Sequence, residues 1–395
     1  MAKARNIFTS FFQSERSGGF VLIGCTLISL IIANSAGGGG YLNFWHSHLD
    51  LSVGGILLDY SVEQWVNDGL MAVFFLMIGL EIERELYVGE LSDLKNALLP
   101  IAAAIGGMVV PALIHILFNS GTPTHRGFGI PMATDIAFAL GILSLAGKRV
   151  PVSLKIFLTA LAIIDDLGAI AIIAIFYTSD FSVTWFLIAL AIFAALFFLG
   201  KRRVFFLPLY LAGGIVMWYC MLKSGVHATI AGVLLAFAIP YPRTGGRNPS
   251  VSLQHGLHYP VAFIILPIFA LANTAILLPK DLIKELTTPN SLGILLGLIV
   301  GKVTGIFLAA YLAVKVKLAS LAPGLNWRWI LGAALLGGIG FTMSIFISIL
   351  AFPGNTDLIN ESKISILTAS LISAILGILV LKRNGRRAGK QDRSA

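Results

Sequence analysis

Four charged residues lie inside long apolar segments of the sequence. Three are acidic, Asp135, Asp165 and Asp166, and the fourth is Lys302, which we expect to be the only buried cation. A charge at the centre of a membrane helix costs about 2.5–3.5 kcal/mol on insertion scales, so four unpaired charges would cost roughly 10 kcal/mol or more. One buried ion pair can simply fix packing. A purely structural role for all four residues is much harder to reconcile with that cost.

The acidic pair in ALAIIDDLGA has the chemistry of a cation site. Adjacent residues of a helix point about 100° apart, so Asp165 and Asp166 face different neighbours, and one of the two can pair with Lys302. A buried carboxylate can carry a proton, and its ionised oxygens are hard ligands for a small hard cation. The sequence offers no Cys and His cluster for a soft metal. A site that binds either protons or a cation, but never both, produces exchange without further machinery.

Two apolar segments contain helix-breaking residues beside polar ones. In GIPMATDIAFALG a Gly and a Pro precede Thr134 and Asp135, and in GGIGFTMS three glycines precede Thr342. This pattern predicts interrupted helices whose free ends line a cavity. Asp135 would then offset the positive N-terminal ends and Lys302 the negative C-terminal ends. The alternative is close helix packing through small residues.

The composition indicates which class of protein carries these segments. Of 395 residues 57% are hydrophobic and only 12% are charged, whereas soluble domains are about one quarter charged. The net charge of +9 would suggest nucleic acid in a soluble protein. Here the basic residues fall between apolar runs, so we expect no nucleic-acid partner. Cys25 and Cys220 lie in apolar runs and are interpreted as core residues, not as a disulfide.

Twelve apolar runs of spanning length predict an all-α integral membrane protein with one transmembrane domain over residues 1–395. The runs are 18–34, 62–82, 97–118, 129–147, 152–177, 182–199, 204–222, 225–241, 259–279, 290–314, 327–350 and 364–382. A signal peptide is the alternative for the first run, because basic residues precede it. The length of that run and the eleven runs that follow favour a first span.

The distribution of Lys and Arg predicts the orientation of the chain. With both termini in the cytoplasm, the inside segments hold 22 of these residues and the outside segments hold five, one of which is Lys363. Leu51–Leu58, in the long first outside loop, has two short runs around Gly54 and Gly55. It predicts a β-hairpin, which is either an ordinary surface turn or a strand pair that joins two subunits.

The two broken runs occupy matching positions. Runs 3–5 (about 97–177) and runs 10–12 (about 290–382) each have the break in the middle run. Two interrupted segments at corresponding positions predict an inverted-repeat transporter with discontinuous helices 4 and 11 and a site at the membrane midplane.

Other titratable residues have weaker assignments. Asp68 in the second run, and the acidic residues at its inside end, could draw cations into a funnel or could belong to a solvated helix end. His227 has a titration range that suits a pH response, although a lone histidine is more often structural. His255 and His258 are expected in the inside loop after the eighth run.

Six segments together resemble the NhaA sodium/proton antiporter family. They are WVNDGLMAVFFLMIGLEIERE, PMATDIAFALG, ALAIIDDLGA, LKSGVHATIAG, LPIFALANT and GIGFTMSIFI, and they extend over almost the whole chain. NhaA is itself an established example of the inverted-repeat architecture. The resemblance implies a ten-plus-two helix fold in which the unwound helices 4 and 11 cross. It also implies a dimer joined through the outside hairpin.

The resemblance also implies roles for individual residues. Asp165 and Asp166 would bind Na⁺ and protons, with Thr134 and Asp135 nearby and Lys302 paired with Asp165. A second group would line the access routes: Asp68 the outer funnel, and Glu81 and Glu85 the inner one. The protein would export Na⁺, and also Li⁺, for imported H⁺ in an electrogenic cycle without a cofactor. It would lie in the bacterial inner membrane, with the basic C-terminal tail near anionic lipids.

The sequence departs from the family pattern at the cytoplasmic face. Strongly alkali-activated members carry charged residues just before the HxxHP segment, where this chain has Val251 and Gln254. Glu83 replaces a common basic residue. The transport core matches the family, but the charged residues at these two cytoplasmic positions are missing, so His227, His255 and His258 remain the candidate titrating groups for a pH response.

Three other functions fit these residues less well. An intramembrane aspartyl protease needs two facing carboxylates, which sequence neighbours on one helix cannot supply. A cation channel needs a continuous pore, and a buried Lys302 opposes free cation flow. A sodium-coupled symporter on a related inverted-repeat fold is the nearest alternative, and it predicts an organic substrate.

Overall fold

The computed structural model describes residues 2–391 except residues 53, 55, 56, 148, 179–180 and 242–247. The chain forms two compact units, each built from separate stretches of sequence. The first unit comprises Met1–Phe20, Gly89–Ala169 and Leu278–Ala395, and the second comprises Val21–Val88 and Ile170–Leu277.

The first unit is helical. It contains the start of α1 (Ala2–Ala33), η2 (Glu90–Ser92), α5 (Leu94–Asn119), η3 (Pro123–Met132), α6 (Ile136–Leu145), most of α7 (Val152–Phe176), α13 (Leu282–Leu286), α14 (Pro289–Leu296), η5 (Gly297–Gly301), α15 (Lys302–Lys315), α16 (Trp327–Gly337), α17 (Phe341–Ala351) and α18 (Thr356–Gln391).

The second unit adds a two-stranded sheet to its helices. It contains α2 (Gly38–His46), β1 (His48–Asp50), β2 (Asp59–Ser61), α3 (Val62–Gln64), η1 (Trp65–Leu70), α4 (Met71–Val88), α8 (Val183–Lys201), α9 (Leu207–Ser224), α10 (Ile230–Ala238), α11 (Pro249–Pro260), η4 (Val261–Ile265) and α12 (Leu266–Asn273), together with the ends of α1 and α7.

Long apolar helices make the chain a multi-pass membrane protein. Among the described residues, seven helices are long and apolar enough to cross a membrane, or up to ten if each of three bent helix pairs is one span. These seven are Val62–Val88, Lys95–Asn119, Val152–Phe176, Val183–Lys201, Pro249–Asn273, Pro289–Lys315 and Thr356–Arg386. The count of twelve spans stays a prediction; the runs at 204–222 and 225–241 correspond to α9 and α10.

The chain is interrupted at both points where the sequence predicts a break. The 3₁₀ helix η3 ends at Met132, and α6 begins at Ile136, after three intervening residues, at an angle of 46°. α16 and α17 meet at 44° across residues 338–340. Pro131 has no backbone N–H to donate, and Asp135 caps α6 with its side chain, so both residue types favour a new helix start here.

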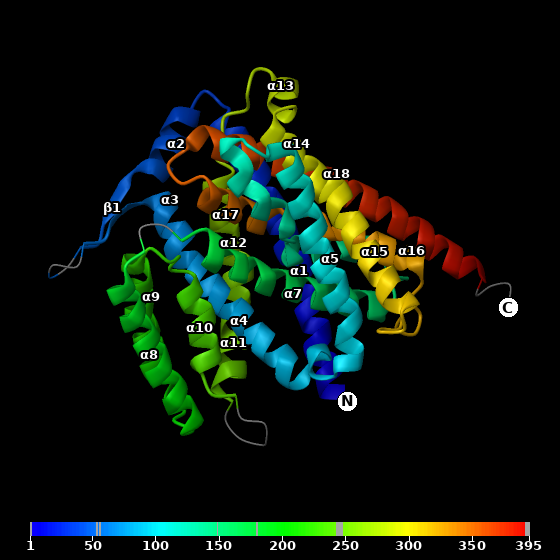
Figure 1. The fold of residues 1–395 in the computed structure, drawn as a ribbon, viewed down its shortest axis with the longest axis horizontal. Coiled ribbons are helices and arrows are strands. Elements are labelled where there is room, and N and C mark those ends of the chain that lie inside the picture. The colour runs from blue at the N-terminus through cyan, green and yellow to red at the C-terminus, as the bar shows by residue number, and fades with distance from the viewer. Residues whose placement is uncertain are drawn as a thin grey trace. The chain divides into compact units, whose positions relative to one another are not determined.

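Glycines bring α5 and α15 into backbone contact. A Cβ added at Gly106 would lie 2.3 Å from the carbonyl oxygen of Gly305, and one added at Gly305 would lie 2.1 Å from that of Gly106. Figure 1 shows the two helices side by side. A Cβ at Gly107 would lie 3.8 Å from Cδ of Lys302. Small residues on these two helices therefore make room for the lysine that follows the π-helix η5.

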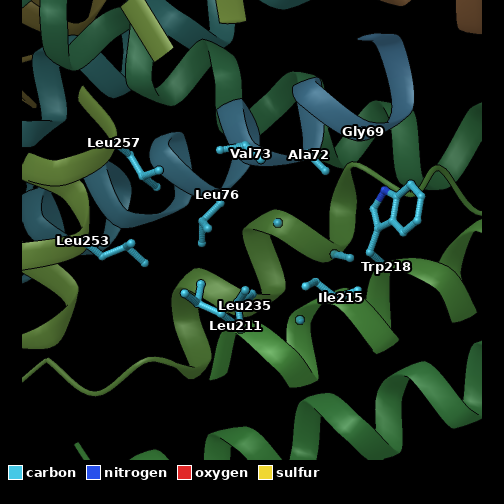
Figure 2. Close-up of a pocket in the computed structure, with 13 residues that line it drawn as sticks. Gly69, Ala72, Val73, Leu76, Leu211, Ile215, Trp218, Leu235, Leu253 and Leu257 are labelled. Carbon is cyan, nitrogen blue, oxygen red and sulfur yellow. The ribbon is translucent and has the colours of Figure 1, made fainter. Parts of the chain in front are cut away.

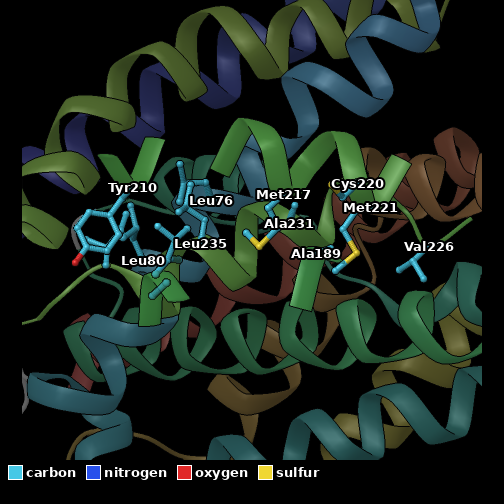
Figure 3. Close-up of a cluster of buried hydrophobic side chains, with 14 residues drawn as sticks. Leu76, Leu80, Ala189, Tyr210, Met217, Cys220, Met221, Val226, Ala231 and Leu235 are labelled. Atoms are coloured by element: carbon cyan, nitrogen blue, oxygen red, sulfur yellow. The ribbon is translucent and has the colours of Figure 1, made fainter. Parts of the chain in front are cut away.

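A buried apolar cluster holds α4, α8, α9 and α10 together in the second unit. Figure 3 shows Leu76 and Leu80 of α4 beside Leu235 of α10, with Met217 of α9 near them. The hydroxyl of the fully buried Tyr210 donates to the carbonyl of Val204 at 2.8 Å, so its polar end is satisfied.

The β-hairpin exists, but its strands lie outside the predicted Leu51–Leu58. β1 pairs antiparallel with β2, with His48 opposite Ser61. The ends of the predicted segment continue this pairing by one hydrogen bond, from the backbone N–H of Leu51 to the carbonyl of Leu58 at 3.0 Å, and the N–H of Leu58 donates to the Ser52 hydroxyl. Hydrogen bonds from Ser52 also lower the pKa of Asp50. Gly54 has the positive φ expected of a turn, and its neighbour Gly55 lies outside the described residues.

Two further expectations are wrong. His255 and His258 lie on helix α11, not in a loop, because Asn248 caps a helix that begins at Pro249. Lys363, assigned to an outside segment, is only 4% exposed within α18, so Lys302 is not the only buried cation. Of the basic residues used to orient the chain, Lys148, Arg243, Arg247 and Arg393 lie outside the described residues.

Replacing Gly305 by Ala should lower the thermal stability of the protein in detergent. The new methyl group would force α5 and α15 apart at the backbone contact, and overpacking of this kind costs about 1–3 kcal/mol. Gly24→Ala is the matched control, because a Cβ there meets nothing within 4 Å. Equal melting temperatures for the two variants would contradict the close contact.

Candidate functional site

The first unit contains a fully buried ion pair. Nζ of Lys302 lies 2.7 Å from Oδ2 of Asp165, and both side chains are completely buried. The ammonium also donates to the carbonyl of Met132, the last residue of η3. The other oxygen of Asp165, Oδ1, is buried and accepts no hydrogen bond. The pair expected from the sequence is present, and it leaves one carboxylate oxygen with coordination capacity.

Thr134 joins this pair to the second chain interruption. Its hydroxyl lies 2.7 Å from Oδ2 of Asp165 and 2.8 Å from the carbonyl oxygen of Gly337, where α16 ends. A hydroxyl has a single proton to donate, so it can satisfy only one of these acceptors at a time. The hydroxyl can therefore change partner when the charge on Asp165 changes.

Asp135 spans the two breaks. Its Oδ1 accepts from the backbone N–H of Phe138 at 2.9 Å and so caps α6. Its Oδ2 accepts from the backbone N–H and the hydroxyl of Thr342, at 3.0 and 2.5 Å, in the first turn of α17. Its own N–H donates to the carbonyl of Ile339 at 2.7 Å. One carboxylate thus lies at two positive helix N-termini, while Lys302 lies at a negative C-terminus.

Asp166 follows Asp165 on α7 and is also buried, with 1% of its surface exposed. It lies within electrostatic range of the Lys302 ammonium. The four charged side chains singled out from the sequence are therefore gathered in one unit, although they come from η3–α6, α7 and α15. Two of the three carboxylates, Asp165 and Asp166, lie within electrostatic range of the one lysine, so the site has an excess of negative charge when all are ionised.

Glycines also explain how Lys302 reaches this position. It follows η5, a π-helix, and such widened turns recur at functional sites. A Cβ at Gly297 would lie 2.7 Å from Cβ of Pro131, and one at Gly301 would lie 2.9 Å from Cα of Pro111. The π-helical turn can therefore lie against η3 and α5 only because these positions lack side chains.

The donor set suits a small hard cation. Carboxylate, hydroxyl and carbonyl oxygens lie together at the site, and these are the ligands that hard cations prefer. Among the described residues no group of three or more His, Cys, Asp or Glu side chains could hold a metal ion. The arrangement can therefore bind a cation through a few oxygens or can bind protons in its place.

The funnel candidates belong to the second unit. Asp68 lies on the π-helix η1, and its backbone carbonyl accepts from Nε1 of Trp218 at 2.8 Å. Glu81 and Glu85 are buried on α4 and flank Arg84, which lies 2.8 Å from Glu85 and 3.6 Å from Glu81. The two glutamates therefore form a charged cluster, not a fully solvated helix end.

The three candidate histidines have different surroundings in the second unit. Nε2 of His227 lies 2.9 Å from the carbonyl oxygen of Tyr177, so this residue has a structural partner. His255 is exposed on α11, and His258 is partly buried one turn further along. His255 and His258 lie within electrostatic range of each other on α11, whereas His227 precedes α10.

Sequence reasoning missed two contacts. The Ser250 hydroxyl donates to Oε2 of Glu83 at 2.7 Å and ties α11 to α4. Thr342 was noted beside the glycines but was not assigned to the site, where it donates twice to Asp135. Its place at the second residue after the GGIG break was the available signal, because the first N–H groups of a new helix need acceptors. Nothing in the sequence pairs Ser250 with Glu83.

An apolar cavity of about 490 Å³ lies elsewhere, in the second unit. Figure 2 shows that Leu76, Leu235 and Leu257 line it, with Trp218 at one edge. None of its lining residues is charged. It therefore cannot supply the ligands of a cation, and it is distinct from the buried ion pair.

Comparison with known proteins agrees with this chemistry. The family described as Na⁺/H⁺ antiporter 1 matches residues 9–381. A protein of Dechloromonas aromatica named Na(+)/H(+) antiporter NhaA is 58% identical over 96% of this chain and 96% of its own length. Proteins with the same name from Flavobacterium psychrophilum and Cytophaga hutchinsonii are 57% and 55% identical, each over 96% of this chain and 97% and 96% of their own lengths.

Thr342→Val should destabilise the protein by about 1.5–3 kcal/mol, the usual worth of a hydrogen bond to a charged group. The variant keeps the shape of the side chain but leaves the buried Asp135 one donor short. Thr304→Val is the control, because that hydroxyl bonds only to carbonyls of its own helix. Thermal unfolding in detergent measures the difference, and equal losses for the two variants would contradict the bridging role of Asp135.

Proposed function

We propose a residue-level mechanism of ion exchange for this chain, which belongs to the Na⁺/H⁺ antiporter 1 family and therefore exchanges Na⁺ for H⁺ across a membrane. It is a transporter and not an enzyme. Nothing in the comparisons supports the alternative of a sodium-coupled symporter.

The observation that carries the mechanism is the Lys302–Asp165 ion pair, in which one carboxylate oxygen has no hydrogen bond. Among the described residues, the Lys302 ammonium lies 2.7 Å from Oδ2 of Asp165, whereas Oδ1 of the same carboxylate is buried without a hydrogen bond. A desolvated oxygen without a donor is unfavourable, and binding a cation or a proton would relieve it. Asp166, the next residue, supplies further carboxylate oxygens at the same depth.

In this mechanism Na⁺ and protons compete for one site. Na⁺ binds between Asp166 and Asp165, displaces the Lys302 ammonium from Oδ2, and takes Thr134 as a neighbouring oxygen ligand. Protons that reach the site from the opposite side neutralise the carboxylates and release the cation. Li⁺, a smaller hard cation, is accepted as well. Three titratable groups, Asp165, Asp166 and Lys302, lie at the site that binds one Na⁺. More than one proton therefore moves per cation, so exchange is electrogenic. No cofactor takes part.

Asp135 serves the site through the helix ends. Its carboxylate offsets the N-termini of α6 and α17, so the interrupted backbone can open a cavity without an uncompensated positive potential. Access to the cavity follows two funnels, with Asp68 in the outer one and Glu81 and Glu85 in the inner one. Negative side chains raise the local concentration of cations.

The architecture we infer is a single transmembrane domain of about twelve spans. η3 with α6 and α16 with α17 would be the discontinuous helices 4 and 11 of two inverted repeats, at about 97–177 and 290–382. The bends of 46° and 44° at these two breaks support that assignment.

We place the protein in the bacterial inner membrane with both termini in the cytoplasm, because most Lys and Arg then lie inside. The basic C-terminal tail would lie near anionic lipids. The β1–β2 hairpin supports a homodimer, since an exposed strand edge can pair with a second copy. Nucleic acid has no part in this function.

Ion-driven proton movement tests the proposal directly. Everted membrane vesicles that contain the protein should lose their proton gradient when Na⁺ or Li⁺ is added, but not when K⁺ is added. Loss of the gradient with all three ions would indicate a channel, and a requirement for an organic substrate would indicate symport.

Asp166→Asn should reduce Na⁺-driven proton movement to background while the protein inserts and folds as the parent does. The amide keeps the shape of the side chain but cannot ionise, so it neither neutralises a cation nor carries a proton. Asp357→Asn, the same change at an exposed residue of α18, is the matched control. Normal exchange by the Asp166 variant would remove Asp166 from the site.

The pH response should be dominated by competition at the site. Apparent Na⁺ affinity is expected to fall steadily with acid while the maximal rate changes little, because protons displace Na⁺ from the aspartates. Gln254 is buried on α11 and cannot titrate, so Gln254→Glu should make the response steeper. The measurement is a full Na⁺ titration at each pH for both proteins.

The result that would contradict this view is a collapse of the parent's maximal rate at saturating Na⁺. If that collapse persisted after replacement of His227, His255 and His258, a strong sensor would have to lie elsewhere in the chain.

A further inference from the structure

A second polar cluster lies in the first unit, and the exchange mechanism does not use it. It joins α5, α14 and α18, and its centre is His115, which is completely buried. Nε2 of His115 lies 3.3 Å from Oδ1 of Asn290. The side-chain nitrogen of Asn290 lies 3.1 Å from Oε1 of Glu361 and 3.0 Å from the Ser362 hydroxyl. We call this chain of hydrogen bonds the His115–Asn290–Glu361 relay.

The partners fix how each group is oriented. Asn290 donates through its nitrogen to Glu361 and Ser362, so its oxygen faces His115. An amide oxygen is only an acceptor, and Nε2 of His115 must therefore carry the ring proton and donate it. The relay then has one consistent direction, from His115 through Asn290 to the carboxylate of Glu361.

Glu361 holds the N-terminus of the helix that carries Lys302. Its Oε1 also accepts from the hydroxyls of Thr288 at 2.5 Å and Ser291 at 3.2 Å. Thr288 is the N-cap of α14, and a negative charge is favourable at a helix N-terminus. The helix continues from Pro289 through η5 to Lys302 as one stretch, about 20 Å at 1.5 Å per residue.

The same cluster holds η3, which ends at the second partner of the Lys302 ammonium. The side-chain nitrogen of Asn119 donates to the carbonyl of Pro289 at 3.0 Å, and the Thr124 hydroxyl donates to Oδ1 of Asn119 at 2.6 Å. A Cβ at Gly127 would lie 3.0 Å from the His115 ring. The imidazole is thus enclosed between η3 and α14.

We propose that the buried His115–Asn290–Glu361 relay is a positioning device that fixes α14–α15 against α5 and η3, and thereby holds the Lys302 ammonium on Asp165 and on the carbonyl of Met132. Lys302 is carried by the helical stretch that begins with α14, and its carbonyl partner Met132 is the last residue of η3. The relay contacts both of these elements far from the ion site. Residues linked by one packed hydrogen-bond network can couple in this way. This inference rests on the proposed competition between Na⁺ and Lys302 at Asp165.

The test is a double-mutant cycle on Na⁺ binding. Asn290→Leu conserves the size of the side chain but removes both its donor and its acceptor. We expect the Na⁺ dissociation constant, measured by calorimetry on the purified full-length protein, to change at least threefold. In a Lys302→Gln background the same substitution should change it by less than 1.5-fold, because the group that the relay positions is gone. Glu361→Gln should show the same pattern and serves if the Asn290 variant does not fold.

The control is Thr368→Val, which removes a hydroxyl of α18 that bonds only to the carbonyl of Ile364 on its own helix. It should leave Na⁺ binding unchanged in both backgrounds. A melting temperature measured in parallel separates structure from positioning, since a purely structural loss would lower it equally with and without Lys302.

Two outcomes would overturn the inference. If Asn290→Leu changes Na⁺ affinity equally in both backgrounds, or in neither, the relay does not act through Lys302, although the proposed exchange site stands. If Lys302→Gln alone leaves Na⁺ affinity unchanged, the proposed competition at Asp165 fails, and the relay has nothing to position.

Discussion

The cost of placing charge in a low-dielectric interior is the constraint on which the rest of the structure depends. Lys302 and Asp165 are completely buried, and leaving either without the other would be strongly unfavourable. The surrounding elements supply polar groups that compensate both charges, the Lys302 ammonium and the Asp165 carboxylate. A helix C-terminus supplies the Met132 carbonyl to the ammonium, and the Thr134 hydroxyl lies against the carboxylate. The site is thus partly satisfied, and Oδ1 of Asp165 is left without a hydrogen bond.

The interrupted helices follow from the same constraint. An unbroken helix satisfies its own backbone groups and has nothing to offer a buried charge, whereas a helix end exposes N–H and C=O groups in the interior. Asp135 takes up the N–H groups at the starts of α6 and α17, and Lys302 takes up a carbonyl at the end of η3. Backbone ends and side-chain charges therefore stabilise one another, and neither would be tolerated alone.

Close helix contact is the second requirement, and it is met by glycine. Lys302 can lie between α5 and the broken helices only because Gly106, Gly301 and Gly305 let backbones approach to van der Waals distance. Away from this contact, polar side chains such as Asn290 and Glu361 set the position of the same helix. Helices that pack through small residues can slide along their axes, whereas directional hydrogen bonds oppose such sliding. The two kinds of contact together define where the lysine lies.

How much the sequence could predict depended on whether the signal was local. Apolar length, the rarity of charge and the Gly and Pro breaks are properties of short segments, so they identified a membrane protein, the breaks beside Thr134 and Asp135, and the four charged residues. The resemblance of six motifs indicated the family. The extent of elements was less predictable: α11 extends over His255 and His258 because Asn248 caps it, and the hairpin strands begin just beyond the expected segment.

Only the tertiary structure decided which residues meet. Asp135 with Thr342, Ser250 with Glu83, and His115 with Asn290 are separated by 207, 167 and 175 positions in the chain. No periodicity or composition links residues so far apart, because each contact follows from how several helices pack at once. The burial of Lys363 has the same origin, since a lysine near the start of a helix looks exposed until other helices cover it. The residue types were therefore readable from the sequence, and their partners were set by packing.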